Sequence, residues 1–138
     1  MGSMKLVLVL LAAVLTVLPA TSRAEVKLLM VEETWCEWCE RWNEDIGVIY
    51  HKTPEGKRAP LLRADVHEAL PSGISLQTRV QYTPTFVLLK DGKEVGRIEG
   101  YPGEDFFWAL LNQLLDRLPT KNETTEANAT GRVPKPAT

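Results

Sequence analysis

The sequence predicts an α/β fold in which helices flank a four-stranded mixed sheet, with the elements in the order βαβ-α-ββα. Two apolar runs, residues 26–31 and 61–66, bracket a segment with helical spacing, which is the pattern of a βαβ unit. Asp91-Gly92 is a hairpin signal between two further strand-like runs. A broad apolar stripe over residues 104–118 then predicts a closing helix.

The first two strands are expected to be parallel, because a helix connects them in a right-handed βαβ unit. Residues 26–31 contain too few polar side chains for a half-exposed strand, so they fit a central strand that is buried on both faces. Residues 38–50 follow with apolar side chains at 3.6-residue spacing, which predicts one amphipathic helix. Residues 51–60 contain two prolines and a glycine and are interpreted as a loop before the strand at 61–66.

The second half of the chain is predicted to add a short helix and a hairpin. Pro71-Ser72-Gly73 breaks the chain, and residues 74–82 suit a short helix with Ser75 as its cap. Residues 85–89 form a strong strand pattern, and residues 94–99 are expected to return antiparallel to it.

The N-terminal residues 1–24 are interpreted as cloning residues followed by a secretory signal peptide. Residues 1–3 precede a second methionine, so Met4 is the expected natural start. Lys5 supplies a positive n-region, residues 6–18 are almost unbroken apolar sequence, and residues 22–24 form a small-x-small cleavage site. The alternative is a membrane anchor, but 13 residues fall short of the roughly 20 that a spanning helix needs. Export with cleavage after Ala24 is therefore predicted.

Residues 25–119 are expected to form one domain, and the polar residues 120–138 to form a disordered tail. The formal net charge is −2, and loss of Lys5 and Arg23 with the leader lowers the basic count from 16 to 14 against 18 acidic residues, giving −4. No basic block is present, so neither nucleic acid nor an anionic membrane surface is an expected partner. The protein is expected to be a monomer.

Both cysteines lie in residues 35–39, Trp-Cys-Glu-Trp-Cys, at the junction between the first strand and the first helix. Outside the cytosol a cysteine pair is usually a structural disulfide. A bridge that closes only two intervening residues constrains little of the unfolded chain, so the spacing favours a reactive pair. Zinc would need a second pair of ligands, and haem attachment would need histidine where Glu40 stands. Neither a metal nor any other cofactor is expected.

Residues 26–118 resemble the thioredoxin family, which implies a thioredoxin-like fold reduced to its minimal core. Residues 35–39 match the Trp-Cys-x-x-Cys motif, Thr83-Pro84 matches the cis-proline turn of the family, and Asp91-Gly92 matches its hairpin. Residues 34–43, Thr-Trp-Cys-Glu-Trp-Cys-Glu-Arg-Trp-Asn, are most similar to the small periplasmic SoxS-type thioredoxins associated with bacterial sulfur oxidation.

The chain departs from the family pattern in three places. Met30 stands where the family usually has a buried acid, and Leu61 stands where a lysine often accompanies that acid. The first strand and helix of full-length thioredoxins are also missing from the expected mature chain. In the family, the buried acid is thought to take the proton of the resolving cysteine, so Met30 predicts slow resolution with water, the departing thiolate or Glu32 as acceptor.

The resemblance and the helix-start position together assign roles to the two cysteines. Cys36 would lie just before the helix, where unpaired N–H groups and the positive dipole end favour its thiolate. We expect Cys36 to attack a target disulfide and Cys39, one turn further, to resolve the mixed disulfide.

The expected substrate-binding residues surround this pair. Trp35 is predicted to be a surface platform, with Glu37 and Trp38 between the cysteines. Thr83 would pair its N–H and C=O with an extended substrate beside Pro84. Of the remaining aromatic and imidazole groups, four carry expectations: Trp42 and Trp108 are expected in the core, and His51 and His67 in solvent.

The charges around the motif favour a reductase. Glu32, Glu33, Glu37 and Glu40 lie close to the cysteines, and Arg41 is the only nearby base. Like charge disfavours a thiolate, although exposed charges are screened. A strong oxidant needs a stabilised reduced form, which these charges oppose.

The predicted function is an exported thiol–disulfide oxidoreductase that reduces mixed disulfides or thioadducts. Its resemblance to SoxS-type thioredoxins implies that the substrate is a sulfur-oxidation carrier protein of the periplasm. A membrane thiol transporter would supply the electrons. One alternative is a general periplasmic reductase for cytochrome c maturation or disulfide isomerisation. Another is a redox-inert module that binds an extended segment at Thr83-Pro84.

Overall fold

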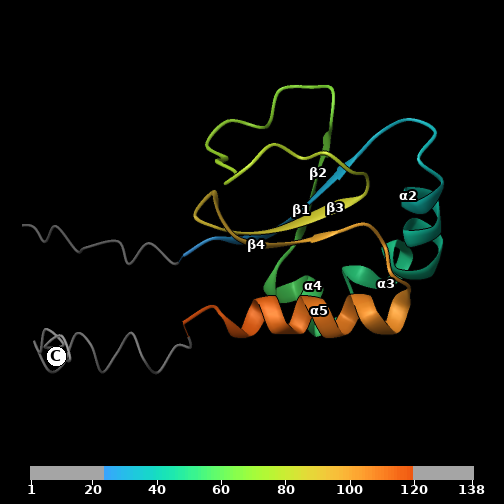
Figure 1. Ribbon diagram of the computed structural model, residues 1–138. Helices are drawn as coiled ribbons and strands as arrows, with labels where there is room; N and C mark the ends of the chain where they lie inside the picture. Colours follow the sequence, from blue (N-terminus) through green and yellow to red (C-terminus); the bar gives the residue numbers. More distant parts are fainter. Residues whose placement is uncertain (1–23, 120–138) are drawn as a thin grey trace, which may run out of the picture.

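The computed structural model describes residues 24–119, which form a four-stranded mixed sheet with helices against it (Figure 1). The strand order is β2-β1-β3-β4, with β1 parallel to β2 and antiparallel to β3, and β3 antiparallel to β4. The strands are β1 (Val26–Glu32), β2 (Leu61–Asp65), β3 (Thr85–Lys90) and β4 (Lys93–Glu99). This arrangement confirms the predicted sheet.

Two predicted features lie outside the described residues: the leader over residues 1–23, ahead of the cleavage site at Ala24, and the tail over residues 120–138. Within residues 24–119, no helix combines the length and the apolar character that crossing a bilayer requires.

Strand β1 is one of the two inner strands of the sheet and is buried on both faces, as predicted. Leu28 and Met30 belong to the cluster beneath the helices, whereas Leu29 and Val31 belong to a second cluster with Val80 on the other face. Figure 1 shows α3, α4 and α5 on one face of the sheet and the irregular chain between β2 and β3 over the other. The sheet therefore supports two small cores, only one of which is covered by helices.

The predicted helix over residues 38–50 is a helical run with an unpredicted π-helical centre. It comprises α2 (Glu37–Trp42), the π-helix η1 (Asn43–Gly47) and α3 (Val48–Tyr50). The apolar face is nevertheless the predicted one, since Cys39, Trp42, Ile46 and Tyr50 are all buried. The wide turn begins at Asn43, whose side-chain Oδ1 accepts a bond of 2.6 Å from Nη2 of Arg63 on β2.

The prediction that residues 51–60 form a loop is wrong, because they contain α4 (Pro54–Arg58). Thr53 caps this helix by accepting the Gly56 N–H at 3.0 Å, and Pro54 occupies the first turn, where its missing N–H costs nothing. Tyr50 Oη donates to the Ala59 carbonyl at 2.8 Å and so ties the C-terminal end of α4 to the core. Threonine followed by proline was the available helix-start signal.

The prediction of a short helix over residues 74–82, capped by Ser75, is also wrong. Ser75 pairs with β4 instead: its N–H donates to Gly92 O at 2.9 Å, and Glu94 N–H donates to Ser75 O at 3.2 Å. These backbone groups are satisfied by the neighbouring strand, so they are unavailable for helical i→i−4 bonds. The extra helix of the fold therefore precedes β2 rather than following it.

A buried ion pair holds this irregular segment against β4. Arg97 donates through Nε and Nη2 to the two carboxylate oxygens of Glu94, each at 2.7 Å, and the two side chains are only 13% and 3% exposed. Glu94 also accepts the Gln77 N–H at 2.7 Å, and Arg97 donates to Thr78 O at 2.9 Å. The hydrogen bond from Arg97 is the main cause that lowers the pKa of Glu94 below 4.5.

Glu94→Gln is expected to reduce stability at neutral pH by about 1–3 kcal/mol, the usual cost of losing a charge-assisted hydrogen bond. Because the folded-state pKa is lowered, this stabilisation is full above the ordinary glutamate pKa and is lost as pH falls through the folded value. Urea unfolding at pH 7 and pH 3 should therefore show a difference between wild type and variant that shrinks at pH 3. Glu99→Gln is the matched control, since Glu99 is half exposed and lies 3.7 Å from Arg97. An equal difference at both pH values would contradict the assignment.

The closing helix α5 (Glu104–Asp116) covers the aromatic core. Trp42 lies 5.0 Å from Phe86, 5.7 Å from Phe107 and 6.0 Å from Tyr50 between ring centroids, so its predicted core position is confirmed. Trp108 is only partly buried and stacks on Tyr50 at 6.1 Å.

Candidate active site

The turn from β1 to α2 presents the cysteine motif at the carboxyl end of the central strand. Trp35 takes a left-handed backbone conformation, with φ of 66°, which is rare for a bulky residue. The Trp35 residue is 93% exposed. The next residue, Cys36, is the N-cap of α2, so the chain turns sharply from strand into helix at the first cysteine.

The two cysteines form a disulfide across the first turn of α2, with Cα atoms 5.2 Å apart. Cys36 Sγ accepts the Cys39 N–H at 3.1 Å, and the Cys36 carbonyl accepts the N–H groups of Cys39 and Glu40. Cys36 is half buried, whereas Cys39 is 3% exposed. In the dithiol state, the same N–H would stabilise a Cys36 thiolate, so the geometry suits attack by Cys36 and resolution by Cys39.

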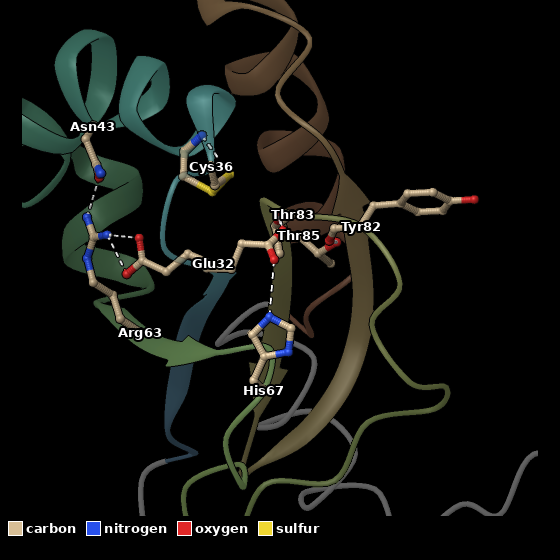
Figure 2. The surroundings of a disulfide bond; sticks show 10 residues. Glu32, Cys36, Asn43, Arg63, His67, Tyr82, Thr83 and Thr85 are labelled. Carbon is tan, nitrogen blue, oxygen red and sulfur yellow. Dashed lines mark hydrogen bonds and ion pairs between the residues drawn. A yellow bond between two sulfur atoms is a disulfide. The ribbon is translucent and has the colours of Figure 1, made fainter.

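The loop before β3 lies beside the disulfide and carries a cis peptide bond between Thr83 and Pro84 (Figure 2). Pro84 is buried, and its carbonyl accepts the Gly100 N–H at 2.7 Å. The next side chain, Thr85, is fully buried and donates to the Tyr82 carbonyl at 2.7 Å. Both ends of this loop are therefore anchored, and Thr83 is held between them.

Glu33 connects three segments around the disulfide, a contact that sequence reasoning missed. One Glu33 carboxylate oxygen accepts from Thr83 Oγ1, and the other lies 3.3 Å from Nε2 of His67. His67 is 74% exposed and so largely solvated as predicted, but it also has this acidic partner. No local pattern could reveal the link, because Glu33 and Thr83 are 50 residues apart.

The predicted substrate-binding residues lie around the disulfide, but their role in binding stays a prediction. Trp35 is exposed, as predicted, and Trp38, which lies between the cysteines, is 58% exposed. Glu37 is exposed at the first position of α2. Sequence reasoning missed Tyr82, which is 62% exposed immediately before Thr83. An aromatic residue next to Thr-Pro was the available signal.

The face of the sheet beneath Cys39 is apolar, with Met30 fully buried in the same core cluster as Cys39. Glu32, two residues further along β1, is already engaged: both of its oxygens accept from Arg63 Nη1, at 2.9 and 2.8 Å (Figure 2). The guanidinium carbon of Arg63 lies 5.8 Å from the centroid of the Trp42 ring. The Glu32 carboxylate is therefore held in an ion pair with Arg63.

No cluster of three or more His, Cys, Asp or Glu side chains suited to a metal ion occurs within residues 24–119.

A family model for the thioredoxin-like domain matches residues 15–115. The chain belongs to the thioredoxin-like family. Two cysteines at bonding distance in a Cys-x-x-Cys motif on this fold form the reaction centre of a thiol–disulfide oxidoreductase.

Two relatives place this thioredoxin-like chain more closely. The reduced form of the periplasmic thioredoxin SoxS of Paracoccus pantotrophus is 46% identical, with a TM-score of 0.66, over 67% of this chain and 98% of that chain. Thioredoxin H-type 1 of Nicotiana tabacum is 36% identical over 81 residues, which are 57% of this chain. The match spans 60% of the tobacco protein's length. The predicted resemblance to SoxS-type thioredoxins is confirmed.

Proposed function

We propose that this chain is an exported thiol–disulfide oxidoreductase that acts as a reductase of mixed disulfides or thioadducts on proteins. The observation that carries the proposal is the asymmetric pair at the start of α2, with Cys36 accessible and Cys39 buried. Similarity to a periplasmic thioredoxin supports export, since the predicted signal peptide would deliver the chain to the periplasm.

The reaction proceeds by two thiol–disulfide exchanges. The Cys36 thiolate attacks one sulfur of the substrate disulfide, which forms a mixed disulfide and releases the other sulfur as a thiolate. Cys39 then loses its proton and attacks Cys36 Sγ, which releases the second substrate sulfur as a thiolate and leaves Cys36–Cys39 oxidised. Two electrons pass to the substrate, and a dithiol donor must return them before the next turnover.

By its similarity to SoxS-type thioredoxins, the substrate is a mixed disulfide or thioadduct on a sulfur-oxidation carrier protein. The electron donor is a membrane thiol transporter, because the periplasm has no thiol buffer of its own to reduce the pair. The acidic residues around the motif support the reductive direction, since they disfavour the thiolate that a strong oxidant stabilises.

Trapping on Cys39→Ala tests this proposal, because a mixed disulfide on Cys36 then has no resolving thiol. The variant is expressed in the native host, and the adducts are identified by mass spectrometry, with Cys36→Ala/Cys39→Ala as the control for non-covalent binding. A single sulfur-carrier adduct is expected. A broad set of adducts would favour the general reductase, and no adduct would contradict both reductases.

Insulin reduction with dithiothreitol separates an oxidoreductase from a redox-inert binding module. The wild-type chain is expected to accelerate insulin precipitation, and Cys36→Ala to leave the rate at that of dithiothreitol alone. Equal rates for the two proteins would support the binding module.

Met30→Asp is expected to accelerate the resolving step by about tenfold or more, because a carboxylate beneath Cys39 would accept its proton. The rate is measured by stopped-flow fluorescence during reduction of a small disulfide. Met30→Asn is the matched control, since it adds a polar group of similar size without a base, and circular dichroism checks that both variants fold. An unchanged resolving rate in Met30→Asp would count against slow resolution in the wild type.

A further inference from the structure

The segment from the end of β1 through the helix that begins at the disulfide is rich in negative charge. Between residues 32 and 45, the acidic side chains are Glu32, Glu33, Glu37, Glu40, Glu44 and Asp45, whereas Arg41 is the only lysine or arginine. Charge of one sign beside a reactive sulfur affects which substrates approach it. The relevant question is which of these carboxylates are already neutralised within the molecule.

Three of the six have partners from other parts of the fold. Arg63 neutralises Glu32, and Glu33 contacts Thr83 and His67. Asp45 accepts a hydrogen bond of 2.9 Å from Tyr101 Oη. These three groups are therefore committed to holding the active-site helix and loops in place.

The other three are unpaired: within residues 24–119, Glu37, Glu40 and Glu44 form neither a hydrogen bond through the side chain nor an ion pair. Each stands two residues before one of the buried residues Cys39, Trp42 and Ile46, so all three point away from the core. Their spacing of i, i+3 and i+7 places them in one row that starts between the cysteines.

Arg41 offsets only part of this row. Arg41 brings one positive charge to this stretch against three unpaired carboxylates, so the row keeps a net negative charge.

Exposed aromatic residues belong to the cysteine motif and to the loop beside the disulfide. Trp35 precedes Cys36, Trp38 stands between the cysteines, and Tyr82 belongs to the loop that Thr83 joins to Glu33. Figure 2 shows Tyr82 extending outward from this loop. Aromatic faces attract cations and apolar groups but offer nothing to an anion. We call these six residues the acidic-aromatic surface: Trp35, Glu37, Trp38, Glu40, Glu44 and Tyr82.

We propose that the acidic-aromatic surface selects substrates whose disulfide is flanked by positive charge, in an extended segment with lysine or arginine close to the reacting cysteine. The inference rests on the proposed oxidoreductase function and adds a substrate class to it. Charge complementarity carries it: an acidic segment would meet three unpaired carboxylates, whereas a basic one pairs with them and with the ring faces.

Three small disulfides of different charge test the proposal: cystamine (cationic), bis(2-hydroxyethyl) disulfide (neutral) and 3,3′-dithiodipropionate (anionic). Stopped-flow fluorescence gives the rate of attack by the reduced protein at constant pH. Each rate is divided by that of 2-mercaptoethanol with the same disulfide, which removes the intrinsic preference of any thiolate. The normalised rate for cystamine is expected to exceed that for dithiodipropionate by about tenfold at low ionic strength. In about 0.5 M salt, where the screening length is about 4 Å, the ratio should fall to about two.

Two triple variants of equal charge locate the effect. Glu37→Gln/Glu40→Gln/Glu44→Gln should bring the low-salt ratio close to one. Glu25→Gln/Asp91→Asn/Asp116→Asn changes three exposed carboxylates away from the cysteines and should keep the wild-type ratio. A wild-type ratio near one, or equal ratios in the two variants, would overturn the substrate class while leaving the oxidoreductase intact. Failure to react with any of the three disulfides would instead overturn the proposed function.

Discussion

Cys36→Ser is expected to abolish disulfide reduction, whereas Cys39→Ser is expected to retain one attack per molecule. The asymmetry follows from burial, because Cys39 is 3% exposed and cannot reach a substrate disulfide that Cys36 can reach. Only Cys36 also accepts a helix N-terminal N–H at its sulfur. Release of thionitrobenzoate from 5,5′-dithiobis(2-nitrobenzoate) measures both variants. Cys36→Ser is expected to show no release at the wild-type rate. Cys39→Ser is expected to release one equivalent without turnover.

The reverse pattern would contradict the assigned roles. If Cys36→Ser released thionitrobenzoate as fast as the wild type, Cys39 would have to be the attacking residue. Its sulfur would then have to be accessible to the substrate in the reduced protein. Iodoacetamide labelling of each reduced single-cysteine variant gives an independent comparison of the two thiols under native conditions.

Trp42→Ala is expected to destabilise the fold by about 3–5 kcal/mol, the range for removing a large aromatic side chain from a core. Trp42 is fully buried and contacts the rings of Tyr50, Phe86 and Phe107, so its loss removes the junction between the active-site helix, the sheet and α5. Guanidinium unfolding monitored by circular dichroism measures the change.

Trp38→Ala is the matched control, because it removes the same side chain one helical turn earlier at a position that is 58% exposed. We expect a cost below about 1 kcal/mol, since surface substitutions away from packed features have small effects. Similar costs for the two variants would show that the aromatic cluster does not hold the active-site helix in place.

The strands and the reactive pair could be predicted because their signals are local. Residues 28–31 are apolar without interruption, which is typical of a strand that is buried on both faces. Asp91-Gly92 specifies the tight turn of the β3–β4 hairpin. The cysteines are three positions apart in the sequence, so a helix start is enough to bring their sulfur atoms together. Local geometry determined these features, and the structure agrees with them.

The two errors in secondary structure have different causes. The short helix α4 was missed because Pro54 and Gly56 were counted as breakers, although proline after a capping threonine is a helix start. Residues 74–82 were assigned to a helix because their pattern permits one, but Ser75 and Gln77 find their backbone partners on β4. Pairing with a distant strand overrides a weak local preference.

The amino-acid sequence by itself determined the four strands of a mixed thioredoxin-like sheet, the position of the reactive pair at a helix start, and the acidic character of its surroundings. Only the tertiary structure decided which of those charges are free. Glu32 and Glu33 are committed to Arg63 and Thr83, 31 and 50 residues away, whereas the row from Glu37 to Glu44 is left unpaired. The physical reason is that a charge acts on a substrate only when no folded neighbour already neutralises it, and those neighbours are brought close by the packing of distant segments.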